Sequence, residues 1–370
     1  MKIIISSSLN PGQWNKILVT HGVSSPWHTS EMLDYYSKSC SAENLSFLLK
    51  SDQDQLIGVC PFFDCEREIL GFGRSRESSV NGSQLPAPLL IHTSSEKENR
   101  KRLRAISAAT DEIASRHNIA CARYVHRPYA FSSSGSTFTE STGLCDLLAN
   151  GFFPTIQQTF VVDLRKTQDL LESDLAQFHR KEIRRAFQQG QVTRVVDAGM
   201  SFSDLVADFQ TYQAAHFHAS GRRTRPQVSF DAMLEMLQSG FATLFINELD
   251  GVPISCLFCG QRNGFAFGWS QANTEAASGI SARHLLEWSA ILHYKKLGFY
   301  LYDIGSMQYE TQFGVQLSEK EKSISFFKER FGGIKIPQIG YIKYFRKEFA
   351  EFELQSHCSH MTNFIERMHV

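Results

Sequence analysis

Apolar and polar positions define the elements of the chain most clearly between residues 240 and 345. "ATLFINEL" and "VPISCLFCGQR" are β-branched and aromatic runs separated by Asp250-Gly251, and "GFAFGWSQ" directly follows Asn263-Gly264. Both dipeptides favour the tight turns that join neighbouring antiparallel strands. The pattern therefore predicts a three-strand meander.

Helical spacing replaces this pattern after the meander. In "SARHLLEWSAILHYKKLG" the apolar face includes Leu285, Trp288 and Leu292. Ser281 is the expected N-cap and Gly298 the expected stop. "FYLYDIG" then indicates a buried strand, "SISFFKERF" a short helix and "IPQIGYIKYF" a final strand. The predicted order is meander, loop, helix, strand, short helix and strand.

A fainter version of the same order occupies the N-terminal half. "LSFLLK" and "QLIGVCPFF" predict a hairpin, a helix is expected over about 95–117, and "IACARYVH" predicts a strand. Between the halves, a helix is expected from about Ser173 to Gly190, and two further helices flank a basic loop. Two copies of one α/β unit explain 370 residues better than a single domain does.

Composition and charge narrow the class of protein. Hydrophobic residues make up 42% and charged residues 21%, as in ordinary soluble proteins. Acidic and basic residues balance at 38 each, which argues against DNA as a partner. No stretch approaches the length of a membrane span or a signal-peptide core. We therefore expect a cytoplasmic protein, one able to meet a membrane-bound substrate at the inner face.

Metal and nucleotide motifs do not account for this chain. Cys256 and Cys259 lie in a predicted strand, where residues three apart face opposite sides, so no metal site is predicted. "GFGRSR" lacks the third glycine and the following helix of a dinucleotide-binding loop. The candidate chemistry therefore has to come from other residues.

Two segments offer anion-binding groups. The loop "QANTEAASGISA" leads into a helix N-terminus, where Ser278, Gly279, Ser281 and Arg283 suit a bound phosphate group. The alternative is an ordinary loop with a capped helix. Basic residues follow each other in "HRKEIRRAFQQG", and two of them, Arg184 and Arg185, are candidates for binding a phosphate as well. Their alternative is a solvated helix surface.

Loop arginines and one lysine complete the candidates. Arg223 and Arg225 suit recognition of an anionic ligand, because guanidinium groups bind carboxylates and phosphates bidentately. Lys328 lies among phenylalanines in "SISFFKERFGGIKIP". It is either a surface lysine with a buried stem or an ammonium group held against aromatic walls, where it would stabilise an oxyanion. The local pattern leaves both readings open.

The C-terminal half resembles a known family. "SARHLLEWSAILHYKKLGFYLYDIGSM", "ISFFKERFGG", "RRAFQQG" and "RRTRP" together resemble the FemABX family of the GNAT superfamily over about 170–340, and "PWHTSEMLDYY" is a weaker N-terminal match. The resemblance implies an α/β (α+β) fold of two tandem GNAT-like domains, each with a mixed, mostly antiparallel sheet flanked by helices. The expected domains are 1–155 and 156–345, followed by a helix over 346–370 that packs back on the N-terminal domain.

The resemblance also implies an activity. Family members transfer an aminoacyl group from tRNA, or an acyl group from a thioester, to an amine, and their Phe-Lys pair corresponds to Phe327 and Lys328. We expect an N-acyltransferase with an acyl-thioester donor and a small-molecule or lipid-linked amine acceptor in cell-wall or surface-polysaccharide synthesis. The alternatives are aminoacyl-tRNA-dependent branching of peptidoglycan and a non-catalytic binding module.

The resulting site joins several segments. Tyr302 or Asp303 is expected to assist proton transfer. Ser270 and Trp269 lie on the strand expected beside the reactive carbonyl group, where Ser270 would contact the donor and Trp269 the acceptor. The phosphate-binding candidates named above would hold the donor, and Arg223, Arg225 and Trp27 are further candidates for binding the acceptor. No tightly bound cofactor is expected; acyl-CoA, an acyl-carrier protein or aminoacyl-tRNA would serve as co-substrate. The loop before Ser281 lacks the glycine-rich coenzyme A signature, which leaves the donor open.

Overall fold

The computed structural model describes residues 2–21, 25–91, 93–127, 147–222, 224–307, 309, 312 and 317–368. The chain divides into two compact units. The first comprises 1–157, 309–317 and 337–370, and the second comprises 158–308 and 318–336. Within the described ranges, no helix is long and apolar enough to cross a lipid bilayer.

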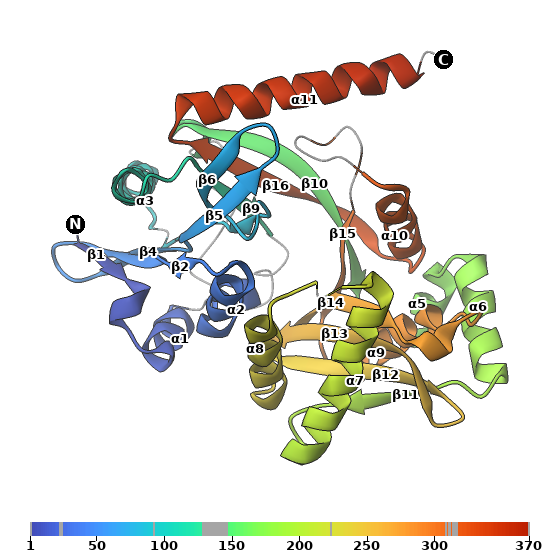
Figure 1. The fold of residues 1–370 in the computed structure, drawn as a ribbon. Coiled ribbons are helices and arrows are strands. Elements are labelled where there is room, and N and C mark those ends of the chain that lie inside the picture. Colours follow the sequence, from blue (N-terminus) through green and yellow to red (C-terminus); the bar gives the residue numbers. More distant parts are fainter. Residues whose placement is uncertain are drawn as a thin grey trace. The chain divides into compact units, whose positions relative to one another are not determined.

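The first unit contains two sheets. One has the order β1 (Lys2–Ile5), β3 (Phe47–Lys50), β4 (Leu56–Cys60) and β8 (Leu89–Leu90); the other has the order β16 (Ile334–Tyr344), β9 (Cys121–His126), β6 (Gly73–Ser78), β5 (Phe63–Ile69) and β2 (Glu43–Asn44), with β7 (Leu85–Pro86) also paired to β9. Its helices are α1 (Pro11–Thr20), α2 (Ser30–Cys40), α3 (Glu96–His117) and α11 (Lys347–Met368) (Figure 1). The hairpin and the long helix expected from the sequence are therefore present.

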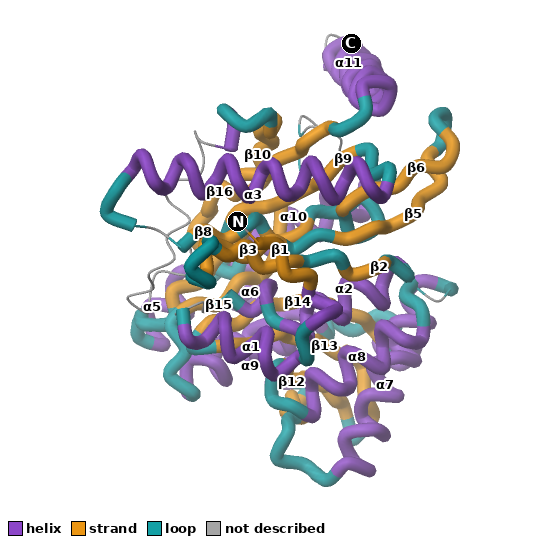
Figure 2. Tube along the Cα trace, turned by 90° about the vertical axis from the view of Figure 1, so that its left-hand side faces the viewer, coloured by secondary structure: helices purple, strands orange, loops and turns teal. Residues whose placement is uncertain are grey.

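Close packing fixes the long helix α3 beside the first sheet (Figure 2). A Cβ atom added to Gly58 on β4 would lie 2.6 Å from Cδ1 of Ile106 and 2.5 Å from the carbonyl oxygen of Leu89, so only glycine permits this approach. The C-terminal helix α11 packs within the same unit, where the ring centroids of Phe349 and Phe72 are 5.0 Å apart.

The second unit contains the predicted meander. The sheet order is β11 (Val192–Val196), β12 (Ala242–Leu249), β13 (Val252–Arg262), β14 (Phe265–Asn273), β15 (Leu301–Met307) and β10 (Phe152–Asp163). The helices are α5 (Gln168–Asp174), α6 (Gln177–Gln188), α7 (Phe202–Ser220), α8 (Gln227–Gln238), α9 (Arg283–Lys296) and α10 (Glu319–Glu329). Asp250 and Asn263 have the left-handed backbone that the predicted turns require.

Helices cover both faces of the meander (Figure 1). On one face Tyr212 of α7 stacks near Phe258 of β13, with ring centroids 5.6 Å apart. On the other face Phe245 of β12 contacts Tyr294 of α9 at 5.8 Å. Neighbouring residues of a strand point to opposite faces, so these nearly continuous apolar strands are buried on both sides. The sheet is consequently a rigid support for the loops and strand ends at its edge.

Two helices begin at different residues from those predicted. The helix expected from Ser173 is split, because α5 ends at Asp174 and α6 begins at Gln177. Ser281 does not cap α9; Ala282 holds the N-cap position, and its carbonyl oxygen accepts hydrogen bonds from Asn247 Nδ2 at 3.0 Å and Ser255 Oγ at 3.2 Å. These buried partners on the sheet fix the first turn of α9 without a side-chain cap.

Candidate functional site

The ends of β14 and β15 form the frame of the candidate site. The two strands pair in parallel at only three positions, the last being Phe267 with Asp303. β14 then continues to Asn273 and β15 to Met307. Since the parallel ladder ends while both strands go on, their facing edges no longer pair with each other, and a ligand could lie between them.

Both strands carry an irregularity at the same level. The register of β13 with β14 shifts so that Phe258 opposes Ser270 and Cys259 opposes Gly268, which leaves Trp269 as the extra residue of a bulge. The register of β10 with β15 shifts next to Ile304 in the same way. Trp269 and Ile304 line the same cavity. Bulges redirect side chains and end regular pairing, so this edge is shaped locally.

That cavity has a volume of about 400 Å³. Residues from six elements (α7, β13, β14, α9, β15 and α10) and the α7–α8 loop surround it: His216, Ala219, Ser220, Thr224, Leu257, Gly268, Trp269, Ser270, Gln271, Arg283, Glu287, Ile304, Lys320, Ile324, Phe327 and Lys328. The structure thus brings together five of the predicted site residues, namely Trp269, Ser270, Arg283, Phe327 and Lys328. Glu287 and His216 join them without having been proposed from the sequence.

Lys328 lies at the C-terminal end of α10 and reaches the strand ends. Its Nζ donates a hydrogen bond to the carbonyl oxygen of Ser306 at 3.3 Å. Burial lowers the pKa of this lysine, and the charges of Asp303 and Glu287 oppose that shift. A Cβ on Gly305, whose φ is +112°, would lie 2.6 Å from Nζ, so glycine lets the ammonium group approach the backbone. This half-buried lysine faces a cavity and carboxyl groups rather than open solvent alone.

Aromatic contacts hold the end of α10 in place. The carbonyl oxygen of Phe327 accepts a hydrogen bond from His179 Nε2 at 3.0 Å. The ring of Phe327 lies 5.2 Å from that of His179, 5.1 Å from that of His284 and 5.1 Å from that of Phe331. His179 was grouped with a basic helix surface, but it is buried in this cluster. Phe327 therefore both walls the cavity and positions Lys328.

Glu287 is a buried carboxyl group beside the strand ends. It projects from α9, and its Oε1 accepts a hydrogen bond from the hydroxyl of Tyr302 at 2.7 Å. Burial raises the pKa of Glu287 to about 7, although the Tyr302 hydroxyl and Lys328 act in the other direction. A carboxyl group with a pKa near neutrality can take or give a proton at working pH. The sequence did not single out Glu287, because a glutamate between two apolar residues of a helix is usually exposed to solvent.

The raised pKa of Glu287 predicts a pH-dependent stability. Between its usual pKa of 4.5 and about 7, the unfolded chain has released the proton that the folded chain retains, so the free energy of unfolding falls as pH rises. Glu287→Gln removes this loss and still accepts the Tyr302 hydrogen bond. Urea titrations at pH 5 and pH 7.5 should show the variant gaining up to about 3 kcal/mol relative to the wild type. An unchanged difference between the two proteins would contradict the assignment.

Ser270 takes part in a second polar cluster in the same cavity. Its hydroxyl lies 2.6 Å from His216 Nε2 and accepts a hydrogen bond from Arg225 Nη2 at 3.2 Å. Burial lowers the pKa of His216 to about 4, and the Arg225 charge adds to this effect. The imidazole is therefore neutral, and Nε2 can accept the Ser270 proton. Nothing in the sequence pattern around His216 indicates this contact.

Asp303 and Tyr302 are buried next to the site and make hydrogen bonds that stabilise it. Asp303 is buried, and its Oδ1 accepts hydrogen bonds from the backbone nitrogen of Gly305 at 2.8 Å and from the hydroxyl of Thr159. Tyr302 is buried between Glu287 and Cys259, whose Sγ lies 3.5 Å from its hydroxyl. Neither residue lines the cavity itself. Their hydrogen bonds shape the strand end and orient Glu287.

The remaining predicted residues lie elsewhere. Ser278 and Gly279 are exposed in the loop before α9, and Ser281 Oγ lies 2.8 Å from His284 Nδ1. Arg184 and Arg185 are exposed on α6, where Arg184 pairs with Glu172 at 3.3 Å. Trp27 is buried in the first unit under the Arg127 guanidinium, 4.6 Å from the ring centroid. Arg223 lies outside the described residues.

Comparisons with known proteins place this site in a recognised fold. Residues 173–311 match the family model of the acetyltransferase (GNAT) domain. FemX is 12% identical with a TM-score of 0.58, and the alignment covers 92% of this chain and 97% of that one. A tandem GNAT protein from the clavulanic acid biosynthesis pathway is 10% identical with a TM-score of 0.53, covering 93% and 98%.

A third solved structure is also similar. The C-terminal domain of a putative lysylphosphatidylglycerol synthetase from Agrobacterium fabrum is 12% identical with a TM-score of 0.55, and the alignment covers 93% of each chain. No curated protein sequence matches significantly. Residues 173–311 therefore belong to a GNAT-type domain, and the resemblance of the chain to the FemABX family is confirmed at the level of the fold.

Proposed function

We propose that the protein is an N-acyltransferase that moves an acyl group from a thioester to an amine in the cavity at the ends of β14 and β15. The parting of these two strands around that cavity carries the proposal. A thioester lying between them would meet the backbone of both strand edges, with Trp269 and Ile304 on either side. The GNAT domain match over residues 173–311 supports the same reaction class.

The cavity residues suggest how the reaction proceeds. The amine nitrogen attacks the thioester carbonyl carbon, a C–N bond forms, and the negative charge on the oxygen is met by backbone N–H groups and the Lys328 ammonium. The C–S bond then breaks, and the thiolate leaves with the bonding electrons. Glu287 accepts the proton released by the amine, for which its pKa of about 7 is suited. Holding both reactants in one cavity supplies much of the acceleration.

A thioester such as acyl-CoA is the donor that we favour. Acyl-CoA is a common co-substrate of enzymes with the GNAT fold, and residues 173–311 match the acetyltransferase (GNAT) domain. The loop with Ser278, Gly279, Ser281 and Arg283 precedes α9, and Arg283 reaches the cavity, so the donor's phosphates would lie along this segment. The chain carries no net charge, which gives no general attraction to tRNA. Arg184 and Arg185 are then solvated residues.

Transfer of an aminoacyl group remains the second candidate function. The similarity to FemX over 92% of this chain favours it, because the FemABX family to which the sequence bears a resemblance includes tRNA-dependent enzymes. The putative lysylphosphatidylglycerol synthetase is a further structural relative that points to the cell envelope. In that case the acceptor would be a peptidoglycan precursor or another lipid-linked amine, and the donor would be charged tRNA.

A donor competition separates these candidates. The purified protein is incubated with an amine mixture and either acetyl-CoA or charged tRNA, and released thiol or deacylated tRNA is measured. We expect thiol release that depends on the amine. Deacylation of tRNA without thiol release would favour the aminoacyl candidate, and activity with neither donor would favour a binding module.

A further inference from the structure

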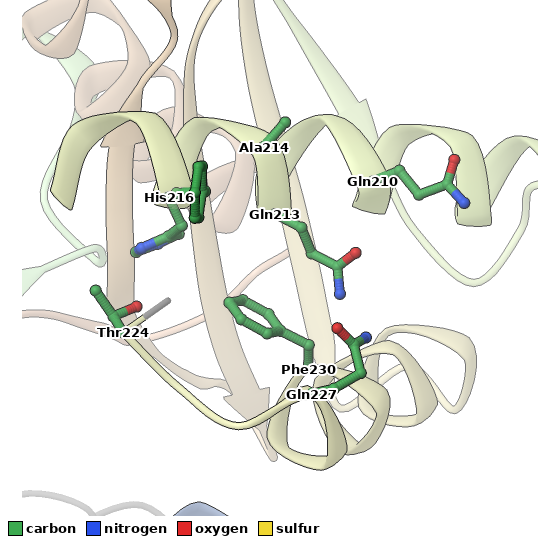
Figure 3. A pocket seen from close by; sticks show the side chains of 8 residues that line it. Gln210, Gln213, Ala214, His216, Thr224, Gln227 and Phe230 are labelled. Atoms are coloured by element: carbon green, nitrogen blue, oxygen red, sulfur yellow. The ribbon is translucent and has the colours of Figure 1, made fainter. Parts of the chain in front are cut away.

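A second cavity adjoins the candidate active site between α7 and α8. It has a volume of about 410 Å³. Figure 3 shows Gln210, Gln213 and His216 on α7, Gln227 and Phe230 on α8, and Thr224 on the loop that joins the helices. His216 and Thr224 also line the cavity that contains Lys328, so the two spaces meet at these residues.

The described residues that line this α7–α8 cavity combine amide and aromatic side chains and carry no charge. Its side-chain amides come from Gln210, Gln213 and Gln227, and no described lining residue is a carboxylate, a lysine or an arginine. The imidazole of His216 is neutral for the reason given above. An anionic ligand would therefore find no cation among the described residues that line this cavity, whereas an uncharged ligand loses little on entering it.

The amides are arranged to hold a group that both donates and accepts hydrogen bonds. The amides of Gln213 and Gln227 point towards one another across the cavity (Figure 3). Gln227 Nε2 donates to Asp231 Oδ1 at 3.0 Å, which orients its carbonyl oxygen as an acceptor. Hydroxyl groups suit such a pair, because each can donate to one amide and accept from the other. Phe230 and Phe217 add apolar surface for a carbon skeleton.

We propose that the α7–α8 cavity binds the uncharged, hydroxylated body of the acceptor, such as the ring of an amino sugar, and that its amine extends past His216 and Ser270 to the thioester. This inference rests on the proposed acyltransferase function. His216 and Thr224 line both cavities, and Ser270, whose Oγ lies 2.6 Å from His216 Nε2, lines the one that contains Lys328. In this arrangement the α7–α8 cavity holds the non-reacting part of the acceptor, so the lining of that cavity determines which class of acceptor binds.

Transfer rates with two amines test the assignment. Glucosamine and cyclohexylamine have rings of similar size, but only the first carries hydroxyl groups. With acetyl-CoA as donor, we expect kcat/KM for glucosamine to exceed that for cyclohexylamine at least tenfold. The double variant Gln213→Leu/Gln227→Leu should lower this ratio at least tenfold by raising KM for glucosamine, since each lost hydrogen bond costs about a factor of ten. Gln188→Leu on exposed α6 is the matched control and should keep the wild-type ratio.

Binding of N-acetylglucosamine tests the cavity without any transfer. Calorimetry should show binding to the wild type that is at least tenfold weaker in the double variant, with the two single variants in between and thermal melting confirming that all are folded. A ratio that the double variant leaves unchanged, or no binding of N-acetylglucosamine to the wild type, would overturn the inference. If binding depends on the glutamines but no amine is acylated, the cavity assignment stands and the proposed function fails. If both amines are acylated equally, the proposed function stands and the cavity assignment fails.

Discussion

Replacing Lys328 with methionine is expected to lower kcat/KM for acyl transfer by about 100- to 1,000-fold, as removal of an oxyanion-stabilising group does. Methionine keeps the length and the apolar contacts of the stem, so the loss isolates the charge. Lys328 donates to Ser306 and faces Asp303 and Glu287, and these contacts fix where its ammonium group acts. Steady-state rates with acetyl-CoA and an accepted amine provide the measurement.

A matched lysine on the same helix controls for the loss of one charge. Lys322 pairs with Glu319 at 2.8 Å and does not line the cavity. Lys322→Met should therefore retain the wild-type rate, and both variants should melt within a few degrees of the wild type. Equal activity of the Lys328→Met variant and the wild type would show that the lysine takes no part in the reaction.

Replacing Gly332 with alanine is expected to destabilise the fold by about 3 kcal/mol or more. Gly332 has a φ of +76°, and a Cβ there would lie 2.6–2.7 Å from the Cβ, carbonyl carbon and carbonyl oxygen of Asp174. Because backbone atoms form part of this contact, the neighbour cannot rotate away, and the steric cost adds to the cost of the left-handed backbone. Urea titration of the two proteins measures the difference in free energy of unfolding.

Gly298 provides the comparison for this prediction. Its φ is +78°, but a Cβ there would meet nothing within 4 Å. Gly298→Ala should therefore cost about 1 kcal/mol, the penalty for the left-handed backbone alone. If the two alanine variants are destabilised equally, the close approach of Gly332 to Asp174 contributes nothing and our account of this turn is wrong.

The sequence predicted the meander and the helix that follows it because the signals there are local. Asp250-Gly251 and Asn263-Gly264 set tight turns, and the apolar face of α9 repeats with helical spacing. The start of α9 was predicted at the wrong residue because Asn247 and Ser255, more than 25 positions earlier in the chain, hold its first carbonyl. Contacts between residues so far apart in the chain leave no signal in the local pattern of apolar and polar residues.

The candidate site was only partly predictable for the same reason. Lys328 and Phe327 stand out in the sequence through their aromatic surroundings and family resemblance. Glu287 does not, because its burial depends on Tyr302 and the strand ends that pack around α9. His216 becomes a candidate site residue only through its contact with Ser270, which lies 54 positions later in the chain. Site residues that are brought together only by tertiary contacts could be identified only from the structure.

Product analysis with a labelled donor tests the central claim most directly. The wild type and Lys328→Met are incubated side by side with carbon-13 acetyl-CoA and an amine, and the products are analysed by mass spectrometry. We predict a labelled N-acetyl amine formed in equal amount with free coenzyme A by the wild type, and about 100-fold less of both with the variant. Coenzyme A released without labelled amine, or equal product from both proteins, would contradict acyl transfer at this cavity.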